Sequence, residues 1–205
     1  MPVVVGYNGK THASEALDWA AEEALHRAAA LVVVFAANYP GMTLPPGPGL
    51  FELEPGALDA ATEVTDAGVA EVRTARPDLI AIGRTVVTSP TEALVDESAE
   101  ASLLVVGSRG RGSVLATLLG SVSFAVASTA HCPAVVVKEG SGTTVVGRRN
   151  RVVVGTDGSE RAASAVTFAA DFAASRSAPM EVICCPVNYR FREPGRATTL
   201  GSRHP

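Results

Sequence analysis

The sequence predicts an α/β protein with an open parallel sheet and helices on both faces. Short apolar runs alternate with longer stretches of helical periodicity through residues 1–138, and this alternation is typical of parallel strands joined by helical crossovers. The composition agrees, because 47% of the residues are hydrophobic but only 5% are aromatic. Alanine and valine must therefore fill much of the core, which suits close packing of helices on a sheet. In addition, the opening segment recurs from residue 151.

Five strands and four helices are predicted in order along residues 1–138. The apolar runs predict strands over 2–7, 31–36, 79–83, 103–106 and 134–138. Helices are predicted over 11–27, 58–75, 90–101 and 121–129. The first helix takes Thr11 as its N-cap and repeats apolar residues at the i, i+3, i+4, i+7 spacing of one helix face. The second helix ends before Pro77, and the proline-rich segment 39–55 is a loop.

The opening segment is partly duplicated. Val152–Gly158 repeats Val3–Gly9 at an offset of 149 residues, and alanines of the following helix recur at the same offset. The second copy is a partial β-α-β repeat that ends near Cys185. We therefore expect a domain over 1–138, a linker over 139–150, a truncated repeat over 151–185 and a disordered tail over 186–205. Because a lone β-α-β segment buries little surface, the repeat must dock on the first domain or a partner chain, or stay mobile.

Charge and composition exclude several classes of function. The net charge of −4 disfavours nucleic-acid binding. No apolar run reaches the roughly 18 residues of a membrane-spanning helix, and the N-terminus lacks a signal peptide, so we expect a cytoplasmic protein without membrane contact. The three cysteines form no C-x-x-C pair and the four histidines show no metal-binding spacing. No metal site is expected.

The stretch from Gly107 to Ser123, GSRGRGSVLATLLGSVS, is the most informative motif. It follows a buried strand and places Gly107, Gly110, Gly120 and Ser121 in a G-x2-G-x9-G-S pattern. Glycine lets backbone approach a ligand closely, and successive N–H groups in such a turn form a concavity for anions. A helix then begins at Ser121, where unpaired N–H groups and the dipole favour phosphate. The pattern predicts a phosphate site built mainly from backbone, and it is not a P-loop.

This spacing resembles the ATP-binding motif of the universal stress protein family. The strand and turn Val3–Gly9 stand where that family has a strand ending in Asp-Gly-Ser, and His131–Val137 resembles the family's C-x-P-V-x-V-V ending. The resemblance covers residues 1–138, so the chain looks like one full unit followed by a truncated second unit. It implies a sheet in the order 3-2-1-4-5, a role in the stress response, and ATP as ligand, with or without Mg²⁺.

The resemblance also assigns the ligand-binding residues. Asn8 stands at the position of the family's Asp that contacts the nucleoside. Asparagine keeps hydrogen-bonding atoms but loses the charge, so the affinity for the nucleotide or the preference for its base can differ from the family's. Gly6 and Tyr7 precede it. Ala36 and Val106 end the second and fourth strands beside the adenine. Gly107, Gly110, Gly120 and Ser121, with the next residue Val122, would cradle the phosphates. Arg109 either contacts phosphate or is solvated, and Ser123 either binds the terminal phosphate or caps its helix. Independently, a doubly wound sheet binds ligands where its strand order reverses.

The leading hypothesis is an ATP-binding regulatory protein with little or no catalytic turnover. Phosphoryl transfer needs a carboxylate that holds a metal, yet no acidic residue lies between Gly107 and Cys132, so slow hydrolysis is the most we expect. One alternative is a module of the same fold that binds partners but no nucleotide, which Asn8 and the truncated copy favour. A PP-loop ATP-using enzyme is disfavoured, because Gly6–Lys10 does not match its S-G-G-x-D-S loop.

Strand five is expected to form a homodimer contact. In the order 3-2-1-4-5, Ala134–Lys138 lies at a sheet edge, and an apolar edge with unpaired N–H and C=O groups invites pairing. The second copy ends before its own strand five, so a second chain is the expected partner. The alternative is a monomer whose edge is covered by 151–185 or the arginine-rich tail.

Overall fold

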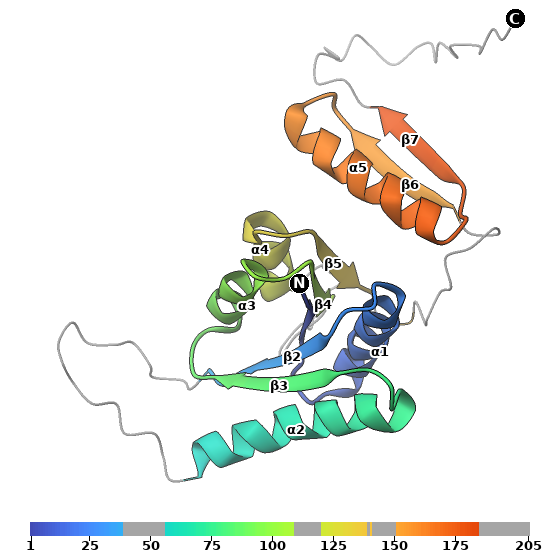
Figure 1. Ribbon diagram of the computed structural model, residues 1–205. Coiled ribbons are helices and arrows are strands. Elements are labelled where there is room, and N and C mark those ends of the chain that lie inside the picture. Colours follow the sequence, from blue (N-terminus) through green and yellow to red (C-terminus); the bar gives the residue numbers. More distant parts are fainter. Residues whose placement is uncertain (39–55, 109–119, 139, 141–150, 185–205) are drawn as a thin grey trace, which may run out of the picture. The chain divides into compact units, whose positions relative to one another are not determined.

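The computed structural model describes residues 1–38, 56–108, 120–138, 140 and 151–184 (Figure 1). The chain divides into two compact units, Met1–Thr144 (unit 1) and Val145–Pro205 (unit 2). The predicted tail 186–205 and almost all of the predicted linker 139–150 lie outside the described residues. The domain boundaries within these segments therefore remain predictions.

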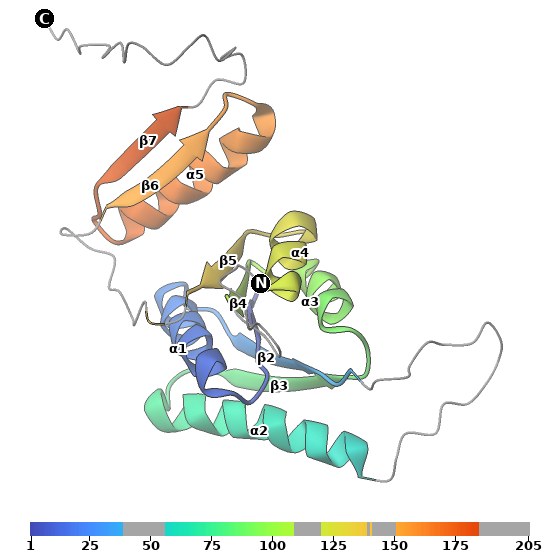
Figure 2. The same cartoon turned by 180° about the vertical axis from the view of Figure 1, so that it is seen from behind.

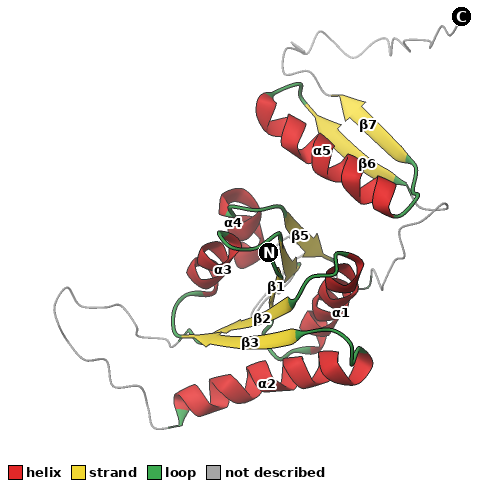
Figure 3. Ribbon diagram, viewed as in Figure 1, coloured by secondary structure: helices red, strands yellow, loops and turns green. Residues whose placement is uncertain are grey.

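Unit 1 contains the predicted five-stranded parallel sheet (Figure 3). Its strands are β1 (Val3–Gly6), β2 (Leu31–Ala36), β3 (Ala81–Val86), β4 (Leu103–Gly107) and β5 (Ala134–Val137). Their order is β3-β2-β1-β4-β5, and all neighbours pair in parallel. The α/β fold and the strand order inferred from the family resemblance are both confirmed.

Two layers of helices cover the sheet, as Figures 1 and 2 show from opposite sides. Helices α1 (Thr11–His26) and α2 (Ala57–Ala75) lie on one face, and α3 (Pro90–Ser98) and α4 (Ser121–Thr129) on the other. Alternate strand residues point to opposite faces. Val4, Val32 and Val34 therefore pack with the α3 residue Leu94 and the α4 residue Val126 in one cluster. Because both faces are covered, the strands are nearly continuous apolar runs.

The α1 face of the sheet depends on small side chains. Helix α1 buries a stripe of mostly alanine residues, which lets its backbone lie close to the strands: Ala13, Ala16, Leu17, Ala20, Ala21 and Ala24. Helix α2 comes equally close at Gly68, where a Cβ atom would lie 2.9 Å from the Tyr7 ring. A packed core with few aromatic residues is the result, as the composition predicts.

Several predicted boundaries differ from the structure. The N-cap of α1 is Lys10 rather than Thr11. Strand β3 runs over 81–86 rather than 79–83, because it pairs residue for residue with β2 from Leu31↔Ala81 to Ala36↔Val86. Helix α3 ends at Ser98 rather than at 101. Its last residue is buried and donates its hydroxyl to the Val95 carbonyl (2.6 Å), while accepting the N–H of His131 (2.9 Å). Pairing and tertiary contacts thus override the local apolar pattern.

Unit 2 is the predicted β-α-β repeat. It consists of β6 (Val152–Thr156), α5 (Glu160–Ser175) and β7 (Met180–Cys184), with β6 and β7 parallel. Helix α5 starts at the N-cap Ser159, whose hydroxyl accepts the Ala162 N–H at 3.3 Å. The register Val152↔Met180 repeats Val3↔Leu31 at the offset of 149 residues.

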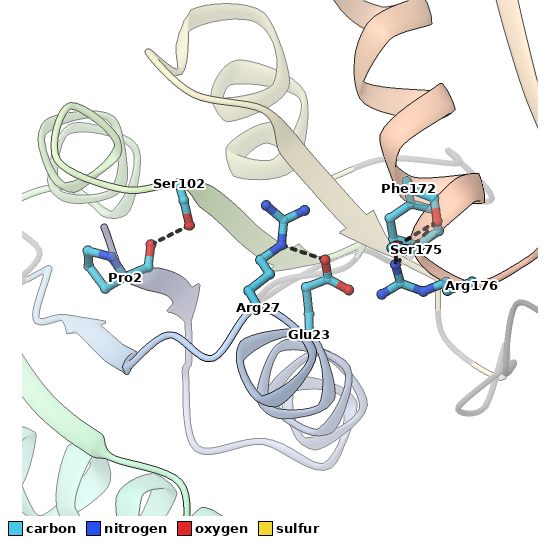
Figure 4. A network of polar contacts seen from close by, with 7 residues as sticks. All are labelled: Pro2, Glu23, Arg27, Ser102, Phe172, Ser175 and Arg176. Atoms are coloured by element: carbon cyan, nitrogen blue, oxygen red, sulfur yellow. Dashed lines mark hydrogen bonds and ion pairs between the residues drawn. The ribbon is translucent and has the colours of Figure 1, made fainter.

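Helices α1 and α5, the two copies of the first helix, differ in the partner of an equivalent arginine (Figure 4). In unit 1, Nε of Arg27 donates to the buried Glu23 carboxylate at 2.6 Å. In unit 2, the corresponding Arg176 lies over the Phe172 ring, 3.7 Å from its centroid. Both copies thus have an arginine four residues after its partner, but the partner is a carboxylate in unit 1 and an aromatic ring in unit 2. In the described part of the chain, no helix is long and apolar enough to cross a membrane.

Candidate functional site

The candidate site lies where the strand order of unit 1 reverses. Strand β1 pairs with β2 on one side and with β4 on the other, and a crevice at the carboxyl ends of such strands is the usual ligand position in this class of sheet. Gly6 ends β1 and Gly107 ends β4. The predicted ligand residues on the first, second and fourth strands therefore all lie at the carboxyl ends of these strands.

The two ends of the glycine-rich segment are fastened to each other. The N–H of Gly120 donates to the carbonyl of Ser108 at 2.8 Å. The hydroxyl of Ser123 donates to the carbonyl of Gly107 at 2.7 Å. Ser108 also donates its own N–H to the carbonyl of Val137 in β5 (2.8 Å). Ser108 and Gly120, the described residues on either side of segment 109–119, thus lie together at the end of β4. Arg109 and Gly110 lie outside the described residues.

Helix α4 begins at the end of β4, and no side chain in the described part of the chain caps its N-terminus. Its N-cap is Gly120, which has no side chain to accept an N–H group, and its first turn contains no acidic residue. The first intrahelical bond there runs from the Phe124 N–H to the Gly120 carbonyl at 2.9 Å. The N–H groups of Ser121, Val122 and Ser123 precede it and have no acceptor within the helix. With the positive end of the helix dipole, they suit an anion.

Ser123 has a structural role in this geometry. Its side chain is buried, and its hydroxyl proton is used in the bond to Gly107. Sequence reasoning left open whether it binds phosphate or caps its helix. The observed bond instead ties the first turn of α4 to the last residue of β4. It fixes the direction in which the helix N-terminus points.

Gly6 and Val106 are held by the core. A Cβ atom on Gly6 would lie 2.9 Å from Leu94 Cδ1 and 3.5 Å from Val106 Cγ1, so a larger residue here would displace the Leu94 side chain of α3. Val106 is buried in the same cluster as Leu94. Both residues therefore offer mainly backbone groups to a ligand at the carboxyl ends of β1 and β4.

The Tyr7 side chain faces α2. It is buried, its hydroxyl donates to Glu71 Oε2 at 3.4 Å, and its ring packs against Gly68. Burial, and then the negative charge of Glu71, raise the pKa of the Tyr7 phenol above its ordinary value. Only the Tyr7 backbone is available at the strand end, where its N–H already donates to the Val34 carbonyl at 2.9 Å.

Asn8 forms the turn that starts α1. Its Oδ1 accepts the N–H of Lys10 at 3.1 Å, a local bond that asparagine and aspartate commonly make in turns. The next residue, Gly9, has φ of 71°, a conformation that favours glycine. Asn8 is half-buried, as is Ala36 at the end of β2. These two residues are the ones in the predicted nucleoside half that expose some side-chain surface.

Sequence reasoning missed the anchoring role of Ser108. This serine is buried; its carbonyl accepts the Gly120 N–H that closes the glycine segment, and its own N–H donates to the Val137 carbonyl of β5. Its position directly after the last residue of an apolar strand was the available signal. Among the described residues, no group of His, Cys, Asp or Glu could hold a metal ion.

The chain matches known proteins over unit 1 and beyond it. The model of the Universal stress protein family matches residues 1–138. Universal stress protein Rv2005c of Mycobacterium tuberculosis is 33% identical over 179 residues, which cover 85% of this chain and 60% of that protein. Universal stress protein Rv2623 of the same species is 32% identical over 182 residues, with the same coverage. The chain thus spans about 60% of the length of these curated relatives.

Solved structures give the same result. A universal stress protein from Archaeoglobus fulgidus in complex with dAMP is 25% identical, with a TM-score of 0.52, over 67% of this chain and 98% of that one. A second A. fulgidus universal stress protein reaches a TM-score of 0.65 over 88% of this chain and 65% of that one; at 18% identity it supports the fold alone. By its sequence match, its sheet order and its glycine motif, the chain belongs to the universal stress protein family.

Proposed function

We propose that this chain is a regulatory protein of the stress response that binds ATP at the carboxyl ends of β1 and β4. The observation that carries the proposal is the uncapped N-terminus of α4, fastened by Ser108 and Ser123 to the end of β4. The A. fulgidus relative described as a complex with dAMP supports an adenine nucleotide as the ligand class.

The two halves of the site would divide the ligand between them. The N–H groups of Ser121, Val122 and Ser123, with the glycine segment and Arg109, would hold the phosphates. Asn8 and the backbone of Gly6 and Tyr7 would hold the ribose. Ala36 and Val106 would lie beside the base. This division places Asn8, which stands where the family resemblance implies an aspartate, at the nucleoside end.

The site is suited to holding ATP rather than hydrolysing it. No acidic residue occurs between Gly107 and Cys132, and the described residues offer no group of side chains for a metal ion. Mg²⁺ would then enter as the counter-ion of the phosphates, without a protein carboxylate to position it for phosphoryl transfer. Turnover would be slow or absent.

Homodimerisation through β5 is the second part of the proposal. The carbonyl of Pro133 accepts the N–H of Leu104 in β4, and that of Val137 accepts the N–H of Ser108 directly after β4. Because successive strand residues point their backbone groups to opposite sides, Val136 directs its N–H and C=O away from β4. In the sheet that the structure describes, β5 is an edge strand, and this outward pair is what a two-fold related strand would bind.

Calorimetric titration with ATP tests the nucleotide site. Gly120 has φ of −70° and ψ of 160°, which valine adopts readily, so Gly120→Val should keep the fold but place a branched side chain where the phosphates approach. Binding should be lost in this variant. Gly155→Val, in open space within unit 2, is the matched control and should bind as the wild type does.

Two results would count against the proposal. Equal ATP affinity in the wild type and Gly120→Val would show that the phosphates lie elsewhere. A wild type that forms dimers but binds no adenine nucleotide would favour the alternative, a dimerisation module of the same fold.

A further inference from the structure

The turn after β1 and its copy after β6 have the same backbone but different side chains. The first reads Asn-Gly-Lys and the second Asp-Gly-Ser, at the offset of 149 residues. Oδ1 of Asn8 accepts the N–H of Lys10 at 3.1 Å, and Oδ1 of Asp157 accepts the N–H of Ser159 at 2.9 Å. The central glycines have φ of 71° and 83°. The two turns therefore differ in the side-chain groups that the turn itself leaves unused.

The lysine of the first turn is a poor start for a helix. In unit 2, the hydroxyl of the N-cap Ser159 accepts the Ala162 N–H at 3.3 Å. In unit 1, the N-cap Lys10 makes no side-chain cap, and the first turn of α1 has no acidic residue. Serine is a favoured N-cap, whereas a cation opposes the positive end of the helix dipole. A residue that the helix does not favour, at the edge of a candidate site, points to a role in binding.

The amide of Asn8 offers a donor where Asp157 offers an acceptor. Because Oδ1 of Asn8 already accepts the Lys10 N–H, its remaining group is Nδ2, which can only donate. The corresponding group of Asp157 is its second carboxylate oxygen, which accepts when ionised. A carboxylate oxygen is a good acceptor for ribose hydroxyls, whereas an amide N–H group needs an acceptor such as a phosphate oxygen. The Asn-Gly-Lys turn thus favours an anion at this point.

The charge of the turn changes in the same direction. The side chains of Asp-Gly-Ser carry one negative charge in unit 2, and those of Asn-Gly-Lys carry one positive charge in unit 1. Lys10 is exposed, and the ion pairs among the described residues do not include it. Glu15, just past the first turn of α1, accepts the N–H of Gly140 at 3.0 and 3.2 Å from its two oxygens. The Lys10 ammonium therefore remains available to a ligand.

The position of the turn indicates which part of a nucleotide it would meet. In the proposed function, the start of α4 holds the 5′-phosphates and the end of β1 holds the ribose. An anion beside Asn8 is then a group on the ribose and not on the 5′ chain. Dinucleotide-binding sheets show the same exchange, because an acidic residue there binds a free ribose 2′-hydroxyl and a basic one accommodates a 2′-phosphate.

We propose that the turn over residues 8–10 selects an adenine nucleotide that carries a phosphate on a ribose hydroxyl in addition to its 5′-phosphate. Nδ2 of Asn8 and the ammonium of Lys10 donate to this extra phosphate. The inference rests on the proposed nucleotide site and deepens it. ATP, whose ribose hydroxyls are free, occupies the same site without this contact.

Calorimetric titration at fixed ionic strength tests the proposal. The ligands are AMP, adenosine 2′,5′-bisphosphate and adenosine 3′,5′-bisphosphate, so that each bisphosphate differs from AMP by one ribose phosphate. The wild type should bind one of the bisphosphates at least about tenfold more tightly than AMP, because charge-assisted hydrogen bonds are the stronger kind. The preferred bisphosphate identifies the hydroxyl, and ATP should compete with it.

A double variant gives unit 1 the turn of unit 2. Asn8→Asp combined with Lys10→Ser should remove the preference for the bisphosphate, while AMP binds at least as tightly as it does to the wild type. Lys138→Ser is the matched control, because it removes the only other lysine of the chain. The preference should survive in this control. Circular dichroism should show an unchanged fold in both proteins.

Distinct results would overturn the inference or the site on which it rests. Equal affinity of the wild type for AMP and both bisphosphates would refute the inference and leave the nucleotide site standing. So would a preference that the double variant keeps or that Lys138→Ser also removes. If Lys10→Ser weakens AMP and the bisphosphates by the same factor, the lysine contacts the 5′-phosphate instead. If the wild type binds none of these ligands and no ATP, the proposed nucleotide site itself is wrong.

Discussion

The bond between Ser123 and Gly107 allows a direct choice between two roles for this serine. Ser123 is 3% exposed, and its hydroxyl donates to the Gly107 carbonyl at 2.7 Å. Ser123→Ala removes the donor and leaves a carbonyl at the end of β4 without this partner. Loss of one partner of a buried hydrogen bond costs about 1–3 kcal/mol. For a protein of this size, about 2 kcal/mol corresponds to a fall of roughly 4–8 °C in Tm.

The assay is thermal unfolding of the nucleotide-free chain, followed by circular dichroism. Ser128→Ala is the matched control: Ser128 lies on the same helix and donates its hydroxyl to the Phe124 carbonyl at 2.9 Å, but it is exposed. That change should alter stability by no more than about 0.5 kcal/mol. If Ser123→Ala unfolds at the wild-type temperature without nucleotide, the hydroxyl is not an anchor, and a role reserved for phosphate would be favoured.

Three further predictions concern other parts of unit 1. Asn8→Asp restores the family carboxylate and should strengthen ATP binding by about 1 kcal/mol, several-fold in affinity, because charge-assisted hydrogen bonds are stronger; a side-by-side fluorescence titration that shows no gain would contradict the placement of Asn8. Tyr7 has a folded pKa above its ordinary value of 10.0, so its contribution to stability is complete below about pH 10 and is lost as the pH rises through the folded pKa. Tyr7→Phe should therefore flatten the alkaline decline of unfolding free energy in urea titrations, and an unchanged decline would contradict the buried phenol. Val136→Pro removes an N–H that points away from β4 and should turn dimers into monomers in light scattering at tens of micromolar; a monomeric wild type, or a dimer indifferent to proline, would refute the β5 contact.

Most of the architecture could be predicted from the sequence, because both faces of the sheet are covered. Buried parallel strands such as 31–36 and 103–106 stand out as apolar runs, and the offset of 149 residues predicted the whole of the second β-α-β unit. Strand β3 was harder to predict. It continues through Arg84 and Thr85, which look like loop residues, because each pairs with a residue of β2.

The location of the candidate site could be predicted from the sequence, but the directions and hydrogen bonds of its side chains could not. The glycine spacing located the end of β4 and the start of α4 correctly. Tyr7 belongs with Val3 and Val5 by strand alternation, so its side chain could have been assigned to the α2 face. The bonds made by Ser108 and Ser123 link residues across the glycine segment, so no local pattern indicates the partners of these two serines. The positions of Arg109 and Gly110 remain predictions.

The stoichiometry of ATP binding tests the central claim most directly. Unit 1 has the glycine segment and the uncapped helix α4, whereas the described part of unit 2 contains neither. Calorimetric titration of the full-length chain should therefore give about one ATP per chain, with no binding by Gly120→Val. A wild type that binds no ATP would contradict the proposed site, and two ATP molecules per chain would show that the site does not depend on the end of β4 and the start of α4.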